Sequence, residues 1–387
     1  KFVNNGALKS TNGVVAISQI DFTNNGSIEG EGGVILFGGN TQQNGLVRQN
    51  SNSAVIDFIA GVHTWNEGAS AIGLFDSDSS ELNFVKISGA TWIVNGAILA
   101  TYVEWSKGTL QVNADMRIGF SLIAGTTIAG SGTITVVPAF VETTQLGHGT
   151  ILQDSVNVEV SEVAILSIKQ GAVITVNDEA AIRNFGEFSS GNISQENPNI
   201  RIGGDSTNTI GAIQNYSIFD HIADGSIMTI DTSFYSDSFV RVRGQESTLS
   251  FLRRTELRDL VEVSNSSSRI TLEGGPVLLK DLEINLFRSG EHGSFEIKSG
   301  TTIFEGNVRG QDIHIAGGTL TGSGSNSGNP SEFRLFGSNK WTAGTIRGAE
   351  EETSEIIVEE GGSLEISTGA SLNLLDHRRF INEGTVS

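Results

Sequence analysis

Charged residues that could act on a polysaccharide gather in one part of the sequence, and they are Asp220, His221, Asp224, Arg253, Arg254 and Asp259. Carboxylates beside His or Arg serve as acid, base or charge stabiliser in lyases and hydrolases. Exposed loop charges have the same composition and contribute little. No set of acids recurs at a fixed spacing, so we interpret the cluster as loop charges. A glycan-cleaving cleft over 215–260 is the alternative.

Oxygen ligands alternate in a second segment, at Asp76, Asp78 and Glu81. Such alternation is what a Ca²⁺ loop needs, but the glycine and the twelve-residue spacing of the helix-loop-helix site are missing. We expect a solvated acidic turn there and no cofactor, with Ca²⁺ at these three residues as the alternative. The basic run His377-Arg378-Arg379 is interpreted as an outward-facing strand segment.

Aromatic side chains offer a third kind of site. A Trp-x-x-Gly-Thr-aliphatic phrase occurs at Trp105 and Trp341, and looser relatives contain Trp65 and Trp92. A Trp at a corner of the chain most simply fills the core. Stacking on a sugar ring is the functional alternative for these four residues.

Four asparagines begin Asn-x-Ser triplets, and they are Asn25, Asn192, Asn215 and Asn265. Such triplets accept glycans in a eukaryotic secretory route. In a chain this rich in Asn and Ser they are expected by chance, and the sequence leaves glycosylation open.

A nine-residue pattern explains how these residues are positioned. Its clearest copy is Leu364–Leu372, and further copies begin at Phe120, Leu166 and Phe295. Each copy alternates apolar and polar residues, continues through a Gly-centred corner, and ends on another aliphatic residue. Alternation over a few residues indicates a strand with one buried face, and the glycine marks a turn. The starts of the copies lie 46, 129 and 69 residues apart, and two of these spacings are multiples of 23.

A second element, aromatic or aliphatic-x-Asn-x-Gly-x-aliphatic, begins at Phe2, Phe22, Ile182 and Phe380. Leu166, Ile174 and Ile182 are eight residues apart, so three strands make a coil of about 24 residues, as in a triangular parallel β-helix. The sequence therefore predicts an all-β fold: one elongated, right-handed parallel β-helix with coils of about 21–25 residues. Residues 1–195 and 301–387 are rich in Gly corners, whereas 196–300 has longer decorated loops.

Composition limits the function. The formal charge is −20, from 44 acidic and 24 basic residues, which argues against nucleic acid as a partner. There is no Cys and no apolar run long enough to span a membrane. These features are typical of a secreted or cell-surface protein of a prokaryotic type. The sequence also begins inside a repeat, so we expect it to be a segment of a longer protein.

The Gly-Thr-aliphatic, Asn-x-Gly and Trp-x-x-Gly-Thr phrases resemble the passenger regions of bacterial surface β-solenoids, including autotransporters and filamentous-haemagglutinin-like adhesins. The resemblance covers most of the chain, and it implies a surface-displayed rod with an adhesive or structural role. We expect a non-enzymatic rod on the order of 80 Å long. Its uncapped ends would join neighbouring segments by strand stacking, through Phe2, Val3 and Asn4 at one end and Phe380, Ile381 and Asn382 at the other. Cell-surface glycans are the alternative partner.

Overall fold

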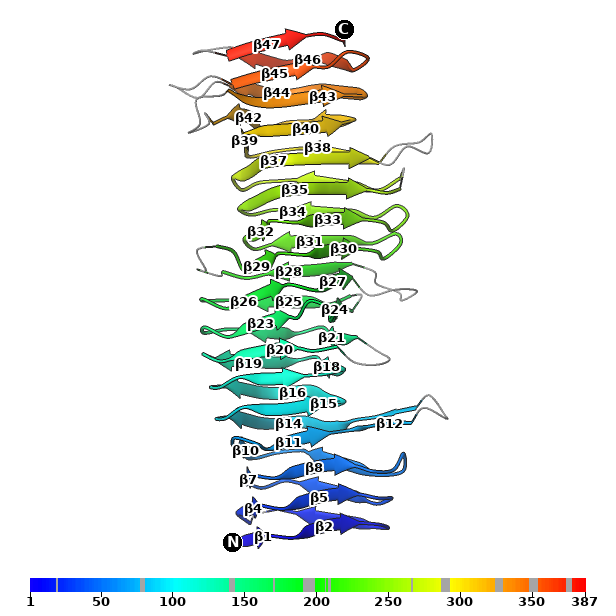
Figure 1. Cartoon of the computed structure of the whole chain (residues 1–387), viewed down its shortest axis with the longest axis vertical. Coiled ribbons are helices and arrows are strands. Elements are labelled where there is room, and N and C mark those ends of the chain that lie inside the picture. The colour runs from blue at the N-terminus through cyan, green and yellow to red at the C-terminus, as the bar shows by residue number, and fades with distance from the viewer. Residues whose placement is uncertain are drawn as a thin grey trace. The chain divides into compact units, whose positions relative to one another are not determined.

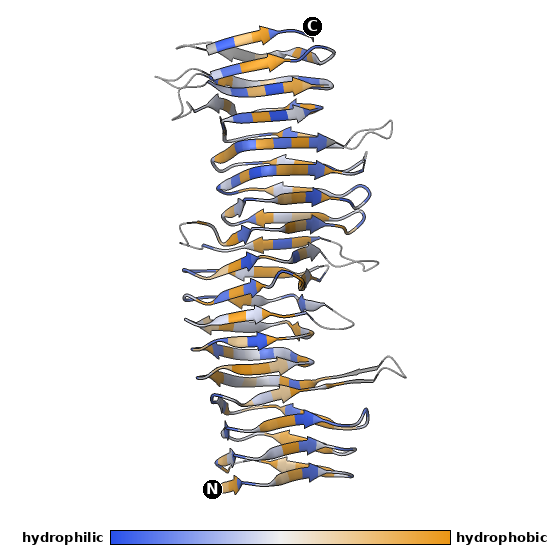
Figure 2. Ribbon diagram, in the orientation of Figure 1, coloured by the Kyte–Doolittle hydropathy of each residue, from blue (hydrophilic) through white to orange (hydrophobic). Residues whose placement is uncertain are grey.

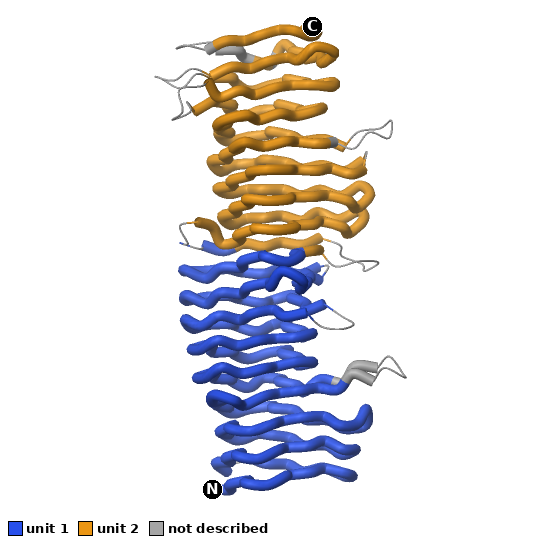
Figure 3. The backbone as a smooth tube through the Cα atoms, in the orientation of Figure 1, with its two compact units in different colours: residues 1–188, 204–208 blue, residues 189–203, 209–387 orange. Residues whose placement is uncertain are grey.

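A computed structural model describes residues 1–18, 20–76, 81–138, 143–169, 171–190, 199–205, 207, 210–265, 267–286, 293–323, 330–347, 354–373 and 378–387. These residues form 48 β-strands and no helix. The strands wind into a parallel β-solenoid of about 15 turns, which confirms the predicted fold class. The chain divides into two compact units, residues 1–188 with 204–208 and residues 189–203 with 209–387 (Figure 3).

Unit 1 stacks its strands in three columns, with one strand of each column in every coil (Figure 1). Column 1a contains β1 (Phe2–Asn4), β4 (Phe22–Asn24), β7 (Thr41–Gln43), β10 (Val62–Trp65), the second parts of β14 (Val85–Val94) and β16 (Val103–Val112), β19 (Thr126–Gly130), β22 (Thr150–Leu152) and β25 (Val173–Val176).

The other two columns of unit 1 follow the same order. Column 1b contains β2 (Ala7–Ser10), β5 (Ser27–Gly30), β8 (Leu46–Gln49), β11 (Ser70–Ile72), β15 (Ile98–Thr101), β17 (Met116–Ile118), β20 (Thr133–Val136), β23 (Asn157–Val160) and β26 (Ala181–Asn184). Column 1c contains β3 (Val14–Ile17), β6 (Val34–Phe37), β9 (Val55–Phe58), the first parts of β14 and β16, β18 (Ser121–Ile123), β21 (Thr144–Leu146), β24 (Ile165–Ile168) and β27 (Glu187–Ser190). A separate antiparallel pair, β12 (Leu74–Asp76) and β13 (Glu81–Asn83), extends from one coil.

Unit 2 repeats this arrangement. Column 2a contains β28 (Ile200–Gly203), β31 (Ile227–Asp231), β34 (Thr248–Phe251), β36 (Arg269–Leu272), β38 (Ser294–Ile297), β41 (Ile313–Ile315), the first parts of β44 (Ser338–Arg347) and β46 (Ser363–Asn373), and β48 (Thr385–Val386). Column 2b contains β29 (Ile213–Asn215), β32 (Phe234–Ser236), the first parts of β35 (Thr255–Val263) and β37 (Val277–Leu286), β39 (Thr301–Glu305), β42 (Thr319–Gly322), and the second parts of β44 and β46. Column 2c contains β30 (Ile218–His221), β33 (Phe239–Val242), the second parts of β35 and β37, β40 (Asn307–Gln311), β43 (Ser331–Phe336), β45 (Ser354–Val358) and β47 (Arg378–Asn382).

The strand register confirms the predicted rungs. Met228 pairs with Leu249, Leu249 with Ile270, and Ile270 with Phe295. The predicted coil length of 21–25 residues is too narrow, because His63 lies 29 residues before its partner Trp92, and Trp92 lies 18 before Leu110. The long coil contains the β12–β13 hairpin, so an insertion at a corner leaves the strand register intact.

Burial alternates along many of the strands, and hydrophobic and hydrophilic residues alternate in colour along the ribbon (Figure 2). In β6, Ile35 and Phe37 are fully buried, whereas Val34 and Leu36 are partly exposed. Aromatic rings stack from coil to coil in unit 1. The ring centroids of Phe37 and Phe58 are 4.7 Å apart, and those of Trp65 and Trp92 are 4.2 Å apart. Parallel in-register strands bring like side chains close together, so these stacks follow from the register.

Close coil-to-coil contact explains the Asn-Gly corners. A Cβ atom on Gly26 would lie 2.0 Å from the carbonyl oxygen of Gly6, and one on Gly45 would lie 2.0 Å from that of Gly26. No side chain fits at such a distance. Each corner is therefore glycine because the backbone of the preceding coil touches it.

Replacing Trp92 with Ala should test this core. Trp92 is fully buried between Trp65 and Trp105, so we expect a loss of about 3–5 kcal/mol in the free energy of unfolding. Val163, which is 78% exposed, supplies the control, since Val163→Ala should change stability by less than about 0.5 kcal/mol. Urea unfolding measures both, and equal effects of the two substitutions would contradict the described core.

Candidate functional site

The structure separates the charged cluster that the sequence suggested. The Asp220 carboxylate is fully buried and accepts hydrogen bonds from Arg241, at 3.1 Å from Nε and 2.6 Å from Nη2. It also forms an ion pair with Arg243. Arg253 binds a different carboxylate, Asp231, with 2.9 Å between Nε and Oδ1. Asp220 and His221 lie within strand β30 (Ile218–His221) and are fully buried, so the interpretation of the cluster as exposed loop charges is wrong for these two residues.

The remaining members of the cluster point in different directions. His221 faces the core, on the opposite side of β30 from Asp220. Asp224 Oδ1 accepts a hydrogen bond from the backbone N–H of Gln245 at 2.7 Å, and the side chain of Arg254 is exposed. Asp259 lies at a bend within β35, with a φ of 66°. These side chains do not converge on one position at which a substrate atom could react.

Arg241 and Arg243, the partners of Asp220, were missed by the sequence analysis. The strand register relates them to Asp220: Arg241 comes one coil after Asp220 in the sequence and is its register partner on the neighbouring strand. Arg241 also lies over the ring of Phe239, with 5.2 Å from Cζ to the centroid. A buried carboxylate that is held by two guanidinium groups ties two coils together.

Two histidines are buried in the cores of the units. His63 Nε2 donates to the carbonyl oxygen of Ala60 at 3.0 Å, and its Nδ1 lies 2.9 Å from Thr41 Oγ1. His221 Nδ1 lies 2.9 Å from the hydroxyl of Ser190. Burial lowers the pKa of His63 and the pKa of His221 to about 4 each, because the charged ring would lose its water. At neutral pH both rings are uncharged parts of the core.

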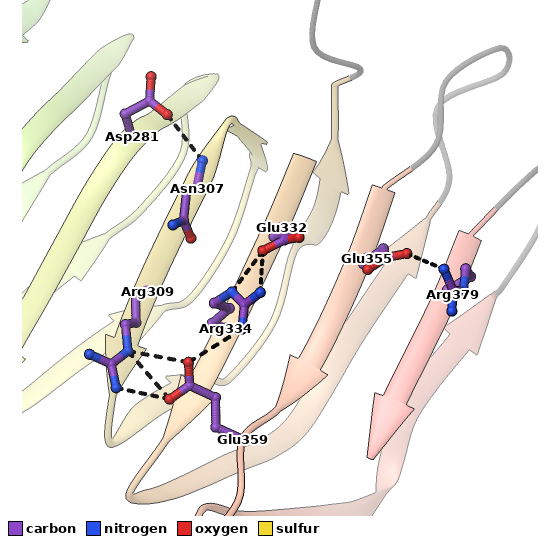
Figure 4. Close-up of polar contacts among 8 residues, drawn as sticks. All are labelled: Asp281, Asn307, Arg309, Glu332, Arg334, Glu355, Glu359 and Arg379. Carbon is purple, nitrogen blue, oxygen red and sulfur yellow. Dashed lines mark hydrogen bonds and ion pairs between the residues drawn. The ribbon is translucent and has the colours of Figure 1, made fainter. Parts of the chain in front are cut away.

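A second group of charges covers column 2c near the end of the sequence (Figure 4). Arg309 from β40 binds Glu359 with 2.9 Å between Nη2 and Oε2, and Arg334 from β43 approaches the same carboxylate at 3.7 Å. Arg334 also donates to Glu332 at 2.7 Å. Arg309 is held over the ring of Phe336, 4.4 Å from its centroid.

The same face continues onto the next coils. Arg379 donates to Glu355 at 2.7 Å, and Asp281 accepts a hydrogen bond from the backbone N–H of Asn307 at 3.1 Å (Figure 4). Every carboxylate drawn in this view is bound by arginine or by a backbone N–H of a neighbouring strand. Carboxylates held in this way link coils and are poor candidates for acid or base catalysis.

The four tryptophans do not form a sugar platform. Trp65, Trp92 and Trp341 are 0% exposed and Trp105 is 1% exposed. A ring without exposed surface cannot stack on a glycan, so the glycan-stacking alternative is wrong for these residues. Their shared role is to fill the interior.

The other sequence-predicted sites have mixed outcomes. Asp78 lies outside the described residues, and the side chains of Asp76 and Glu81 do as well, so the calcium alternative stays a prediction. Among the residues that the structure describes, no group of three His, Asp or Glu side chains could hold a metal ion.

Of the asparagines that begin Asn-x-Ser triplets, Asn192 is outside the described part. Asn215 is fully buried, with its Nδ2 2.9 Å from Ser236 Oγ, so it is inaccessible to a glycan in the folded chain.

Asparagine side chains form ladders along unit 1. Asn25 Nδ2 donates to Asn5 Oδ1 at 2.8 Å, Asn44 donates to Asn25 at 2.7 Å, and Asn66 donates to Asn44 at 2.5 Å. An inner ladder runs beside it, in which Asn4 donates to Asn24 at 2.8 Å. Each outer amide thus donates to the coil before it, which gives the ladder a direction.

An open groove of 370 Å³ lies on the outer face of column 1a. Thr23, Gln42 and Thr64 line its floor, together with Asp21 and Asn40. Its lining combines hydroxyls and amides with one carboxylate and one cation, Lys1, so it offers hydrogen bonds but no pair of acids.

The residues expected at the ends of the stack lie on exposed strand edges. Phe2, Val3 and Asn4 form β1, and among the described strands β1 pairs only with β4. Phe380, Ile381 and Asn382 lie in β47, which pairs only with β45 among the described strands. Phe2 is 49% exposed, whereas its partner Phe22 is 1% exposed.

Comparison of the chain with protein-family models, with curated proteins and with solved structures finds no match. The described residues contain no helix that is long and apolar enough to cross a membrane.

Replacing Asp220 with Asn should expose the role of the buried ion pair. The substitution leaves two guanidinium groups without their counter-charge, so we expect the free energy of unfolding to fall by about 2–3 kcal/mol. Chemical denaturation measures this loss. Asp231→Asn is the matched control, because Arg253 is 59% exposed and such a pair contributes less than about 1 kcal/mol. A smaller effect at Asp220 than at Asp231 would contradict our interpretation.

The buried histidines predict a pH dependence of stability. Their folded pKa of about 4 lies below the ordinary value of 6.5, so the unfolded chain binds more protons between these pH values. Stability is then complete above pH 6.5 and falls as the pH drops toward 4, by up to about 3 kcal/mol for each histidine. Urea unfolding at pH 7 and pH 4.5 measures the change. His63→Gln with His221→Gln should reduce this slope, and an unchanged slope would refute the assignment.

Proposed function

We propose that this chain is a non-enzymatic structural β-solenoid segment of an extracellular surface protein or filament. It joins neighbouring segments end to end by strand stacking, and its outer faces are available for adhesion. The partner at each end is a further copy or an adjoining repeat.

The single observation that carries this proposal is the repetition of one contact from coil to coil. Strands such as β1, β4 and β7 pair in parallel and in register, and the asparagine ladder adds a side-chain bond at the same corner. A strand edge that is bonded on one side only recruits another strand. A stack built in this way lengthens when further coils are added through the same strand pairing and the same asparagine hydrogen bonds.

The charges support a mechanical role. Several arginines are held by carboxylates of neighbouring strands, as Asp220 holds Arg241 and Glu355 holds Arg379. These pairs strengthen the lateral links between coils and leave fewer free cations for an acidic polysaccharide. The net charge of −20 and the absence of cysteine suit an extracellular surface.

A cell-surface glycan is the second candidate partner, and the groove on column 1a is the observation in its favour. Thr23, Gln42 and Thr64 repeat hydroxyl and amide groups there at the coil spacing. A neutral glycan would match this polar strip, because hydroxyls and amides make up most of its polar lining and the charges of Lys1 and Asp21 offset each other. Binding of neutral oligosaccharides by the purified chain, lost in Gln42→Ala, would favour this role.

The structural proposal predicts concentration-dependent self-association. Electron microscopy and sedimentation of the purified chain should show linear assemblies that grow with protein concentration. A chain that stays monomeric over the micromolar range, and that cleaves or binds a polysaccharide instead, would contradict the proposal.

A further inference from the structure

The outer side of column 1a is uncharged from β7 to β25, although the chain has a net charge of −20. Alternate residues in this part of the column point outward, and every one of them is Thr, Gln, Val, Ile or Ala. Examples are Val62 and Thr64 in β10, Thr109 and Gln111 in β16, and Val173 and Thr175 in β25. This surface is the uncharged face of unit 1.

The outer sides of the other two columns carry charges of both signs. Lys9, Glu29 and Arg48 are register partners on column 1b, and Asp57 and Lys86 are register partners on column 1c. Two copies of a strongly acidic chain repel each other. A contact between copies therefore meets the least electrostatic repulsion where neither copy presents a charge.

The uncharged face is also regular and stiff. Thr91, Thr109 and Thr127 are register partners on consecutive strands, so their side chains form one column. β-Branched side chains have few rotamers, so covering them costs little conformational entropy. No outward residue of this face is aromatic, and a sugar would find no ring to stack on. These properties suit a second flat sheet better than a glycan.

The two edges of the uncharged face carry opposite charges. At the corner where the chain turns from column 1c into column 1a, the exposed basic residues are Lys107, His148 and Lys169. At the corner that leads from column 1a into column 1b, the exposed acidic residues include Glu67, Asp115, Asp154 and Asp178. From β7 to β25, the described residues of the first corner include no acid, and those of the second include no base.

Opposite charges also lie on the same coils. Lys107 precedes the column-1a part of β16 and Asp115 follows it, so this coil is basic at one edge and acidic at the other. The coils of β22 and β25 repeat the arrangement, with His148 and Asp154 in the first and Lys169 and Asp178 in the second.

We propose that the uncharged face binds the uncharged face of a second copy of this chain, with the two copies parallel and side by side. A twofold axis that runs along the stack of coils exchanges the two edges, so the basic edge of each copy faces the acidic edge of the other at the same coil. A twofold axis across the stack would place each edge against its own kind. Charge complementarity therefore selects the parallel pair.

This contact is separate from the end-to-end joining proposed above, because it uses the side of the stack. Sheets that pack face to face lie about 10 Å apart, and the long side chains of Lys107 and Lys169 span much of that gap. Strands spaced by about 4.8 Å make the uncharged face about 30 Å long. Such a contact is at the small end for a specific interface. We therefore expect a weak pair, with a Kd in the micromolar range.

A charge placed on the uncharged face tests the contact. In Thr109→Glu the new carboxylate would be buried between the two sheets without a partner, so the Kd of the pair should rise at least about tenfold. Thr135→Glu is the matched control, because Thr135 is an outward, partly exposed threonine of column 1b. This variant should leave the Kd unchanged. Sedimentation of the full chain measures both, and equal weakening by the two variants would overturn the proposal.

Charge reversal at the edges tests the orientation. Lys107→Glu should weaken the pair, because the new carboxylate would face Asp115 of the second copy. Adding Asp115→Lys to the same chain should restore the pair, since each edge then has the opposite sign and the two edges still attract. In an antiparallel pair, Lys107→Glu alone would strengthen association, and that result would overturn the parallel arrangement.

Spin labels measure the orientation directly, since the chain contains no cysteine. Arg48→Cys and Arg117→Cys each give one labelled position on the outward side of column 1b, away from the contact. In a parallel pair the distance between the two labels should be the same for both positions, as pulsed electron spin resonance measures it. In an antiparallel pair the distance at Arg48 would be longer, because Arg117 lies nearer the middle of the face.

The outcomes separate this contact from the proposed function. Linear assemblies that Thr109→Glu and Lys107→Glu leave unchanged would overturn the side-by-side pair but keep end-to-end joining. Pairs of fixed size that these variants dissociate, without longer assemblies, would support the pair and contradict end-to-end joining. A chain that stays monomeric and binds neutral oligosaccharides in a way that Thr109→Glu abolishes would assign the uncharged face to a glycan and overturn the pair.

Discussion

Parallel backbone pairing between successive coils is the interaction on which the rest of the structure depends. Each strand of an interior coil pairs its N–H and C=O groups with strands of the coils before and after it, so the backbone is satisfied along the stack. This pairing fixes the distance between coils. At that distance no side chain fits at a tight corner, which is why Gly26 and Gly45 are glycine. The corners, the columns and the ladders all follow from one spacing.

The same spacing turns side chains into repeating contacts. Residues that occupy one register position lie directly over each other, so an asparagine binds an asparagine and an aromatic ring packs on a ring. Ion pairs between coils also follow from the strand register. Asp220 and Arg241 are register partners, and their contact is possible because one coil separates them. Stability is therefore distributed along each unit, as expected for a structure in which each repeat contacts its neighbours.

A structure of this kind has natural interfaces at its ends. Interior coils are covered on both sides by parallel strands, whereas β1 pairs only with β4 among the described strands. Strand stacking between copies would use the same hydrogen bonds that hold the units together. Assembly and folding would then be the same physical process.

The sequence alone determined the fold class, the rungs from Met228 to Phe295 and the absence of cysteine chemistry. Alternating apolar residues and Gly-centred corners are local signals, and the rungs from Met228 to Phe295 paired as their spacing predicted. Only the tertiary structure decided which residues meet. The copies beginning at Leu166 and Leu364 read alike, yet the first turns from column 1c to 1a and the second from 2a to 2b. The tryptophans fill the core, as the sequence predicted, but the contact of Asp220 with Arg241 was not predicted, because contacts between coils depend on the length of every intervening corner. The length of a corner changes when a loop is inserted there, and a short sequence pattern within one strand does not reveal that length.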